Sequence, residues 1–328
     1  MDYIVTLFQS LTVQAIAPTT AAFAIAAIGL NIHFGFAGLL NIGQAAFLLL
    51  GGYGFAISIE RGLPLGIAVL VALLCALIFA FVLGLPTLKL RGDYLAIVTI
   101  SAAEIIRMVG RSSILTSLTG GSNGITGQSF NGPFFALSPL PDHATTILWF
   151  TYDNNGVNGW WIRIVGWALV GVFTLLVFAL SRSPWGRVLK GIREDEDAVR
   201  SLGKNVYSYK LQALILGGLI GAIAGIIYVL PSSVQPDGLG RSTTFFIYTA
   251  LLLGGAASVF GPVLGAVLFF VMRLLVQTLA QDFIPTSIMN GQQATQFSYV
   301  LVGVALMCLI IFRPQGILGN KRELSFSV

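Results

Sequence analysis

Long apolar runs recur along this chain and constrain its fold more than any other feature. Nearly uninterrupted runs occupy residues 65–85, 160–180, 211–230, 259–279 and 299–312, and less uniform runs occupy residues 15–32, 42–59, 94–109 and 243–253. A bilayer core about 30 Å thick needs on the order of 20 apolar residues per helical crossing. Only 9% of the residues are charged, whereas soluble domains have about 25%. We therefore expect an all-α, polytopic membrane protein that forms a single transmembrane domain over residues 1–328.

The distribution of basic residues predicts the orientation. Residues 112–161 contain no Lys or Arg, whereas residues 182–210 contain seven. Cytoplasmic loops of membrane proteins are enriched in these residues, so loop 112–159 is expected outside and segment 182–210 inside. The scheme requires residues 243–253 to cross and predicts about eight transmembrane helices with a cytoplasmic C-terminus. Residues 3–14 form either a ninth crossing or a surface helix, and no removable signal peptide is expected because the N-terminus lacks a basic region.

Several functional classes are excluded by composition and spacing. The net charge of +5 comes mostly from segment 182–210 and from the ends of apolar runs, which orientation explains better than nucleic-acid binding. Cys75 and Cys308 both lie inside apolar runs, so neither a disulfide nor a metal site is indicated. His33 and His143 are isolated, and no catalytic or metal-ligand spacing is found. We expect no enzyme activity and no cofactor or metal bound by this chain.

Segment 182–210 contains 11 of the 31 charged residues of the chain. Four consecutive acids at 194–197 precede Arg200 and Lys204, an order that suits the dipole of a short helix. Glu196 and Arg200 have the spacing of an i,i+4 ion pair, and Gly203 is a typical helix stop. Such a helix, about ten residues long, is marginal in water alone and needs a surface to pack on.

Three interpretations of this segment remain open from the residues alone. It is a solvated loop that fixes orientation, a membrane-surface element, or a docking helix for a cytoplasmic protein. Surface binding is disfavoured, because anionic lipid repels the four acids. If the segment docks, its narrow apolar stripe of Ala198, Val199 and Leu202 is the expected contact face.

Glycines recur at a spacing of four in two apolar runs. Gly217, Gly221 and Gly225 form one stripe, and Gly261 and Gly265 repeat the spacing. Small residues at this spacing let another helix approach closely. Packing within the subunit is the simpler interpretation of both stripes.

Polar residues in or beside the apolar runs are candidates for a translocation pathway. Glu104 lies about 15 Å into the run that begins at residue 94, and its i,i+3 spacing allows it to pair with Arg107. An ion near the bilayer centre costs about 2.5–3.5 kcal/mol, so the pair is either a gate or interface anchor, or a structural ion pair. Asn31, Asn41 and Gln44 flank an early apolar run and are candidates to line a pathway, and helix-end capping explains the two asparagines as well.

The stretch Thr119–Ile125 is rich in glycine and predicts a turn or irregular loop. It lacks the Lys-Ser/Thr ending of a phosphate-binding loop, so ATP is not expected here. Gly120, Gly121 and Asn123 belong either to an ordinary loop or to a segment that re-enters near an outer gate or faces a delivery protein.

Several stretches together resemble one family. They are GFAGLLNIGQAAFLLLGGYG (35–54), GDYLAIVTISAAEIIRMV (92–109), LTGGSNGIT (118–126), SPWGRVLKGIREDEDAVRSLGKNVYSYKLQALILGGLIGAIAGIIYV (183–229), GGAASVFGPVLGAVL (254–268) and FRPQGILG (312–319). In this order they resemble LivM-type permeases, the membrane subunits of branched-chain amino acid ABC importers.

The resemblance implies a bacterial inner-membrane permease that has no nucleotide-binding domain of its own. It implies two ATPase subunits that bind ATP and Mg²⁺, a second permease of LivH type, and an extracytoplasmic substrate-binding protein. It also implies that residues 194–203 form the coupling helix, which inserts into a groove on an ATPase. The residues then expected to couple are Arg193, Glu194, Asp195, Glu196, Asp197, Ala198, Val199, Arg200, Leu202 and Gly203.

Other functions remain open at this point. A urea or short-chain amide permease would use a similar subunit, so the sequence does not decide the substrate. An ion-coupled secondary transporter would use paired ions such as Glu104 and Arg107 but would need no docking helix. A membrane scaffold would show no transport defect when Glu104 is replaced.

Overall fold

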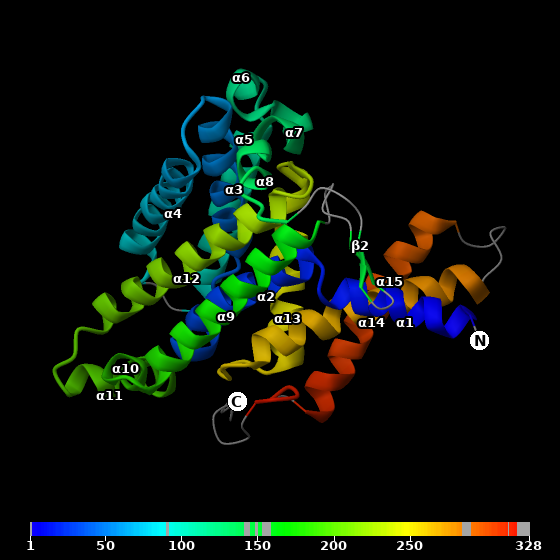
Figure 1. The fold of residues 1–328 in the computed structure, drawn as a ribbon. Helices are drawn as coiled ribbons and strands as arrows, with labels where there is room; N and C mark the ends of the chain where they lie inside the picture. Colours follow the sequence, from blue (N-terminus) through cyan, green and yellow to red (C-terminus); the bar gives the residue numbers. More distant parts are fainter. Residues whose placement is uncertain are drawn as a thin grey trace.

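The computed structural model describes residues 2–89, 92–140, 145–147, 150–152, 159–283, 290–313 and 315–319. These residues are almost entirely helical, which confirms the expected all-α polytopic fold (Figure 1). The long helices are α1 (Asp2–Ala15), α2 (Pro18–Asn31), α3 (Gln44–Glu60), α4 (Leu65–Thr87), α5 (Gly92–Arg111), α9 (Trp160–Arg182), α12 (Val206–Val229), α13 (Arg241–Gly254), α14 (Gly261–Phe283) and α15 (Gly291–Phe312).

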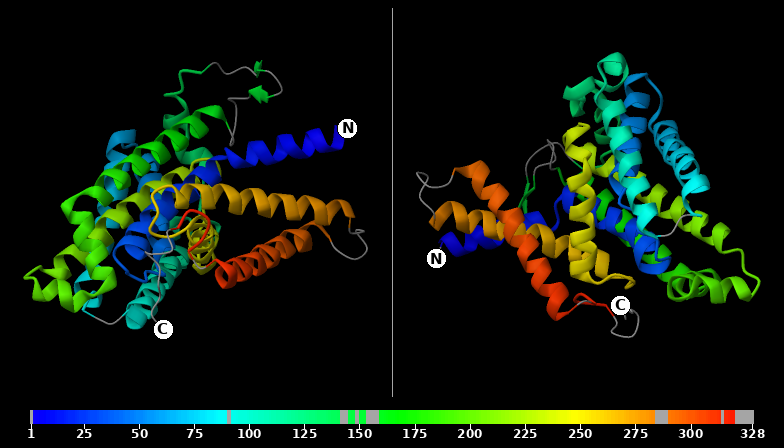
Figure 2. Two further views of the ribbon diagram at one scale, coloured as in Figure 1. Left: turned by 90° about the horizontal axis from the view of Figure 1, so that it is seen from below. Right: turned by 180° about the vertical axis from the view of Figure 1, so that it is seen from behind.

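From α2 onward, each of these long helices corresponds to one of the apolar runs of the sequence. Five helical stretches in the described residues are long and apolar enough to cross a membrane by length and composition alone: Pro18–Phe36, Leu65–Thr87, Trp160–Arg182, Val206–Val229 and Gly261–Asp282. Helix α1 is shorter, and it packs alongside α14 (Figure 2).

The centre of the molecule is formed by α2, α3 and α12. Five alanines of α2 (Ala21, Ala22, Ala24, Ala26 and Ala27) are completely buried. Small side chains on both sides let the helices approach closely: a Cβ at Gly225 would lie 2.0 Å from the Leu48 carbonyl oxygen, and one at Gly217 would lie 2.4 Å from that of Gly29. The glycine stripe of α12 therefore lies against helices of the same subunit.

The remaining glycines of the two stripes are equally enclosed. A Cβ at Gly221 would meet Gln44 Nε2 at 2.6 Å. One at Gly265 would meet the Ala250 carbonyl oxygen at 1.8 Å, and one at Gly261 would meet the Gly255 carbonyl oxygen at 2.3 Å. Helices α13 and α14 are thereby held as a tight hairpin.

One end of the molecule carries α10 (Pro184–Glu194) and α11 (Glu196–Ser201), which connect α9 to α12 (Figure 1). This is the end expected to be cytoplasmic. The chain tail packs on the turn between α13 and α14, since Ile317 N donates to Leu253 O at 3.2 Å and Leu318 N donates to Gly254 O at 2.9 Å.

The opposite end, expected to face outward, carries short elements. They are η2 (Ser113–Leu115), α6 (Thr116–Thr119), η3 (Gly121–Asn123), β1 (Ile125–Thr126), α7 (Gly127–Phe130), α8 (Gly132–Phe135), β4 (Ser233–Val234) and η4 (Asp237–Leu239). Strands β1 and β4 pair antiparallel, with Ile125 opposite Val234. A second pair joins β2 (Thr145–Ile147) to β3 (Phe150–Tyr152). The sequence predicted neither pair.

Candidate functional site

The charged segment forms two helices, not one. Asp195 has an extended backbone (φ −154°), which ends α10, and its Oδ1 accepts hydrogen bonds from Asp197 N at 3.0 Å and Ala198 N at 2.9 Å. It is therefore the N-cap of α11. The prediction of a single helix over 194–203 is wrong, because Glu194 belongs to α10 and α11 already ends at Ser201. Gly203 (φ +76°) lies beyond that end.

The two sides of α11 differ in exposure. Val199 is 8% exposed and Ile192 of α10 is 4% exposed, so both belong to the side that faces the subunit. Leu202 is 79% exposed, and Ala198 is exposed beside it. The expected contact face is corrected accordingly: Val199 is buried within the protein, and the outward face consists of Ala198 and Leu202.

Ion pairs hold α11 in this orientation. The predicted pair is present, with Arg200 Nη2 at 2.9 Å from Glu196 Oε1, and Arg200 also pairs with Asp197. Lys210 of α12 reaches the other carboxylate oxygen of Glu196. Exposed pairs contribute at most about 1 kcal/mol each, so their main effect is on geometry. The carboxylates of α11 are thus engaged locally, and Leu202 remains free of them.

Arg193 joins the charged segment to the core of the protein. Its Nη1 donates to the Gly35 carbonyl oxygen at 2.6 Å, and its side chain also pairs with Glu194. Gly35 lies in η1 (Ile32–Phe36), a π-helical turn that continues α2. Lys190 adds a cation–π contact, with its Nζ 5.9 Å from the centre of the Phe36 ring. Arg193 and Lys190 therefore connect α10 to the end of α2.

A buried polar network continues from this turn into α12. Gly43 N donates to Asn41 Oδ1 at 2.9 Å, which fixes the amide so that Nδ2 faces His33 Nδ1 at 3.1 Å. His33 Nε2 lies 3.0 Å from the Leu214 carbonyl oxygen. Since a carbonyl only accepts, Nε2 carries the proton and Nδ1 accepts from Asn41. Gln44 Nε2 approaches the Gly217 carbonyl oxygen at 3.5 Å.

Asn41 and Gln44, both pathway candidates, are completely buried in this network. Their side chains bind neighbouring helices of the same chain and reach no open surface. Their position suits a role in holding η1 against α12. His33 had no expected role, because its partners are 8 and 181 residues away along the chain.

Asn31 secures the turn between α13 and α14. Its Nδ2 donates to Ser258 O at 2.7 Å, and its Oδ1 accepts from Ala257 N at 2.8 Å. Ala257 has φ +62°, a conformation that non-glycine residues rarely adopt without support from their surroundings. The same end of α2 therefore contacts the charged segment, α12 and this turn.

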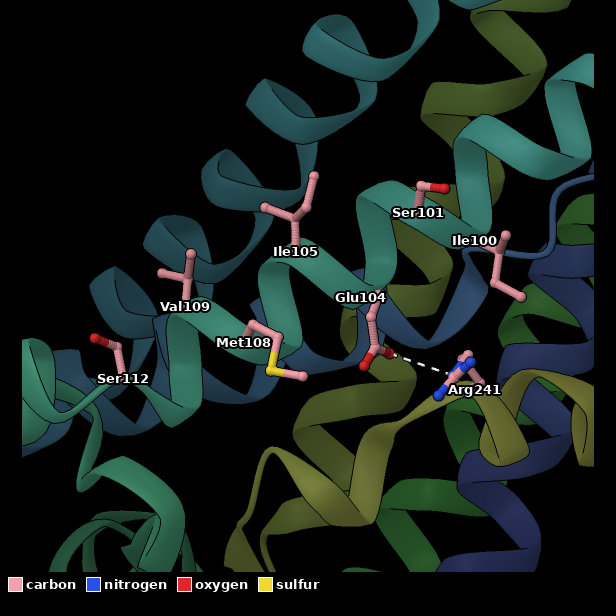
Figure 3. A pocket seen from close by; sticks show the side chains of 8 residues that line it. All are labelled: Ile100, Ser101, Glu104, Ile105, Met108, Val109, Ser112 and Arg241. Carbon is pink, nitrogen blue, oxygen red and sulfur yellow. Dashed lines mark ion pairs between the residues drawn. The ribbon is translucent and has the colours of Figure 1, made fainter.

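At the outward end, five ions form a chain between α5 and α13. The predicted Glu104–Arg107 pair is present at 2.5 Å, and Arg107 also contacts Asp237. Arg111 lies 3.6 Å from Asp237, and Arg241 Nε lies 3.5 Å from the second carboxylate oxygen of Glu104 (Figure 3). One weak signal for this cluster is present in the sequence: Asp237 is the single acid between Asp197 and Asp282, and Arg241 follows it by four residues.

The surface of α5 beside these ions is open. Ile105 is 62% exposed and Met108 is 50% exposed, although both are large and apolar. A cavity of about 630 Å³ lies along this face, and Glu104 and Arg241 point toward it (Figure 3). Its lining consists of Ile100, Ser101, Glu104, Ile105, Met108, Val109, Ser112 and Arg241. A carboxylate in an exposed apolar helix face is suited to contact a partner or a passing solute.

The glycine-rich stretch is a structured part of the outward end. Gly120 and Gly121 have φ of +73° and +61°, and Asn123 is exposed. A Cβ at Gly124 would lie 1.9 Å from the Val234 carbonyl oxygen. The stretch is thus packed closely on the connection between α12 and α13. His143 lies outside the described residues.

The part of the chain that the structure describes contains no group of three or more His, Cys, Asp or Glu side chains that could hold a metal ion. Both cysteines are free thiols. The candidate functional features are the exposed apolar pair Ala198 and Leu202 at α11, a buried connection through η1, and an open face on α5.

Comparisons with known proteins give consistent results. Residues 12–310 match the family model described as a branched-chain amino acid transport system permease component. The chain is 32% identical to the high-affinity branched-chain amino acid transport system permease protein LivM of Escherichia coli, over 94% of this chain and 70% of that protein. It is 26% identical to a probable LivM permease of Methanocaldococcus jannaschii, over 90% of each chain. It is 23% identical to the LivH permease of Salmonella typhimurium, over 92% of each chain.

Proposed function

The chain belongs to the family of branched-chain amino acid transport permease components, and we propose that it is a membrane subunit of an ATP-driven importer of branched-chain or other hydrophobic amino acids. In this proposal it lies in a bacterial inner membrane, with α10, α11 and the C-terminus in the cytoplasm. Two separate ATPase subunits bind ATP and Mg²⁺. A related LivH-type permease completes the pathway, and a soluble binding protein delivers the substrate from outside.

The observation that carries the proposal is the solvent-exposed face formed by Ala198 of α11 and by Leu202 at its C-cap. Ala198 and Leu202 are exposed on a short, charge-braced helix at the end expected to be cytoplasmic. A leucine that is 79% exposed in such a position favours insertion into a partner's groove, where its burial contributes about 1.5–3 kcal/mol. We infer that this face binds an ATPase subunit.

The connection through Arg193 supplies a route for coupling. Closure of the ATPases on ATP would displace α10 and α11, and Arg193 would carry that displacement to η1 through Gly35. The network of His33 and Asn41 then passes it to α12. Packed helices shift as units, so access would alternate between the two sides of the membrane.

The open face of α5 is the part of the subunit best suited to line the pathway. In this proposal it faces the second permease, and the solute passes between the two. Glu104 would then be a polar position on an otherwise apolar wall, held in place by Arg107 and Arg241. Apolar residues on such a wall suit the passage of hydrophobic amino acids.

Uptake by reconstituted vesicles tests the function. The permease pair should be inserted into liposomes with and without the ATPase subunits, and the binding protein should be added outside. Uptake of radiolabelled leucine, glutamate and urea should then be compared. We expect leucine uptake into the vesicles only when the ATPase subunits are present and ATP is enclosed on the inside. Uptake driven by an ion gradient without ATPases would show a secondary transporter, and preference for urea would show a short-amide permease.

Replacement of Arg193 by methionine should separate docking from coupling. The variant loses the hydrogen bond to Gly35 but keeps Ala198 and Leu202, so the ATPase should still co-purify. Coupling free energies between sites are about 1–3 kcal/mol, so uptake should fall on the order of tenfold. Arg187→Met is the matched control, because Arg187 is exposed and donates within its own segment to Arg182 O. Normal uptake by Arg193→Met would contradict the proposed route.

Replacement of Glu104 by glutamine tests the role of the α5 face. The change removes one charge but keeps hydrogen-bonding atoms near Arg107, so stability should fall by no more than about 1 kcal/mol. We expect uptake to fall several-fold while assembly with the second permease is retained. Glu60→Gln, at the exposed end of α3, is the control. A loss of assembly with normal transport per assembled complex would instead assign Glu104 a structural role.

A further inference from the structure

A second cavity lies on the other side of α13 from the α5 pocket. It has a volume of about 440 Å³ and is lined by Val13, Gln14, Ala17, Thr19, Phe23, Arg163, Tyr228, Gly238, Ser242, Thr243, Phe246, Phe269, Phe270, Arg273 and Tyr299. Arg241 lines the α5 pocket, whereas its neighbours Ser242 and Thr243 line this cavity. The two cavities therefore use opposite faces of the same helix.

Two arginines, Arg163 and Arg273, line this cavity. Neither Arg163 nor Arg273 forms an ion pair with any acid in the described part of the chain. The Nε of each is buried and has no hydrogen-bond partner. Arg273 Nη1 makes one long contact, 3.4 Å, with the Tyr299 hydroxyl. A buried charged donor that lacks an acceptor is costly, so an anionic ligand is indicated.

Aromatic rings orient both guanidinium groups. Arg273 lies 5.6 Å from the centre of the Phe270 ring and 5.5 Å from that of Tyr299, and Arg163 lies 5.7 Å from that of Trp160. Such contacts attract the cation by about 0.5–2 kcal/mol but leave the N–H donors of its edge unsatisfied. The planar fork of Arg binds phosphate or carboxylate oxygens in pairs. The site is thus preorganised for an oxyanion.

The depth of the cavity indicates which oxyanion it receives. Gln14 and Ala17 lie at the junction of α1 and α2, Arg163 in the first turn of α9, Tyr228 in the last turn of α12 and Ser242 in the first turn of α13. All of these helix ends belong to the end expected to be outside. These helix ends lie near the level expected for lipid headgroups. Arg273, Phe269 and Phe270 lie deeper, in the middle of α14, where the aromatic wall is suited to an acyl chain.

The helix beside the cavity also exposes large apolar side chains, as a lipid-facing helix would. Ile4 of α1 is 71% exposed, and Phe8 is 68% exposed, while Val13 and Gln14 of the same helix line the cavity. Helix α1 packs on α14 at the side of the molecule away from α5 (Figure 2). We propose that Arg163 and Arg273 bind the phosphate of an anionic phospholipid from the outer leaflet, and that this lipid holds α1, α9 and α14 together.

Binding is tested on the purified full chain in detergent after delipidation. Thermal unfolding and native mass spectrometry should be run with phosphatidylglycerol, with diacylglycerol of the same chains, with inorganic phosphate and with leucine. We expect phosphatidylglycerol alone to raise Tm in a saturating manner and to be retained as a stoichiometric adduct. Equal protection by diacylglycerol, by inorganic phosphate or by leucine would overturn the assignment of a lipid phosphate.

Variants locate the effect. Arg163→Gln and Arg273→Gln should each lose the phosphatidylglycerol-dependent rise in Tm and the retained adduct, whereas Arg61→Gln, an exposed arginine beyond α3, should keep both. The lipid-dependent shift is measured within each variant, so a lower starting Tm does not obscure it. Should a glutamine variant fail to fold, Arg163→Lys and Arg273→Lys keep the charge without the fork and should bind the lipid less tightly. Wild-type retention in both lysine variants and in any foldable glutamine variant would refute the site.

Discussion

Replacement of Gly225 by alanine should prevent the permease from reaching a stable folded state. The new Cβ would lie 2.0 Å from the carbonyl oxygen of Leu48 and 2.7 Å from its Cα. These are backbone atoms of α3, so no side chain can rotate away, and α12 must separate from α3. Overpacking costs about 1–3 kcal/mol even where side chains can adjust, and here we expect at least the upper value.

The measurement is the yield of monodisperse protein after detergent extraction, together with its Tm. Gly171→Ala is the matched control, because Gly171 is also a mid-helix glycine but a Cβ there meets nothing within 4 Å. Alanine favours a helix over glycine by about 1 kcal/mol in water, so the control should be as stable as the parent. Equal yield and Tm for the two variants would show that α3 and α12 do not approach as closely as described.

Replacement of Leu202 by aspartate should abolish ATPase docking without affecting membrane insertion. Leu202 is 79% exposed, so the free permease loses nothing on substitution. In the complex, the change would place an unpaired carboxylate in an apolar groove, at a cost of several kcal/mol. A loss of even about 2.8 kcal/mol weakens binding a hundredfold. Ala198→Glu, on the same face, should act in the same direction.

Co-purification of the ATPase with the tagged permease measures this effect. Leu137→Asp is the control, since Leu137 is 62% exposed at the opposite end of the molecule and should retain the ATPase. Val199→Asp should behave differently from Leu202→Asp, because Val199 is buried and its change should lower the stability of the permease itself. Unchanged ATPase recovery with both Ala198→Glu and Leu202→Asp would refute docking through α11.

The sequence predicted those features that depend on local pattern. Apolar runs located the long helices, and the spacing of Glu196 and Arg200 predicted their ion pair. It did not predict that Asp195 divides the charged segment, because four consecutive acids are all compatible with the start of a helix. The acid that becomes the N-cap of α11 is decided by the position at which the chain turns. That position depends on the burial of Ile192 and Val199 against the rest of the subunit.

Contacts between residues that are far apart in the sequence could not be predicted from local patterns. Asn41 offers the same amide whether it lines a pathway or bridges His33 to its own loop, and only the folded chain brings His33 to the Leu214 carbonyl. The spacing of Glu104 and Arg107 predicted that they pair. The second partner of Arg107 is Asp237, which lies 130 residues away in the sequence. Arg163 and Arg273 were equally hidden, because no local feature of the sequence shows that a cation has no acid partner among the residues that the structure describes.

The pairing of β1 with β4 has a mechanical consequence. It ties the segment that follows α5 to the segment that precedes α13, and the ion chain from Glu104 to Arg241 ties the same two helices a second time. The outward ends of α5 and α13 are therefore joined twice, once through backbone hydrogen bonds and once through charged side chains. We expect these two helices to keep their relative position when other helices of the subunit move.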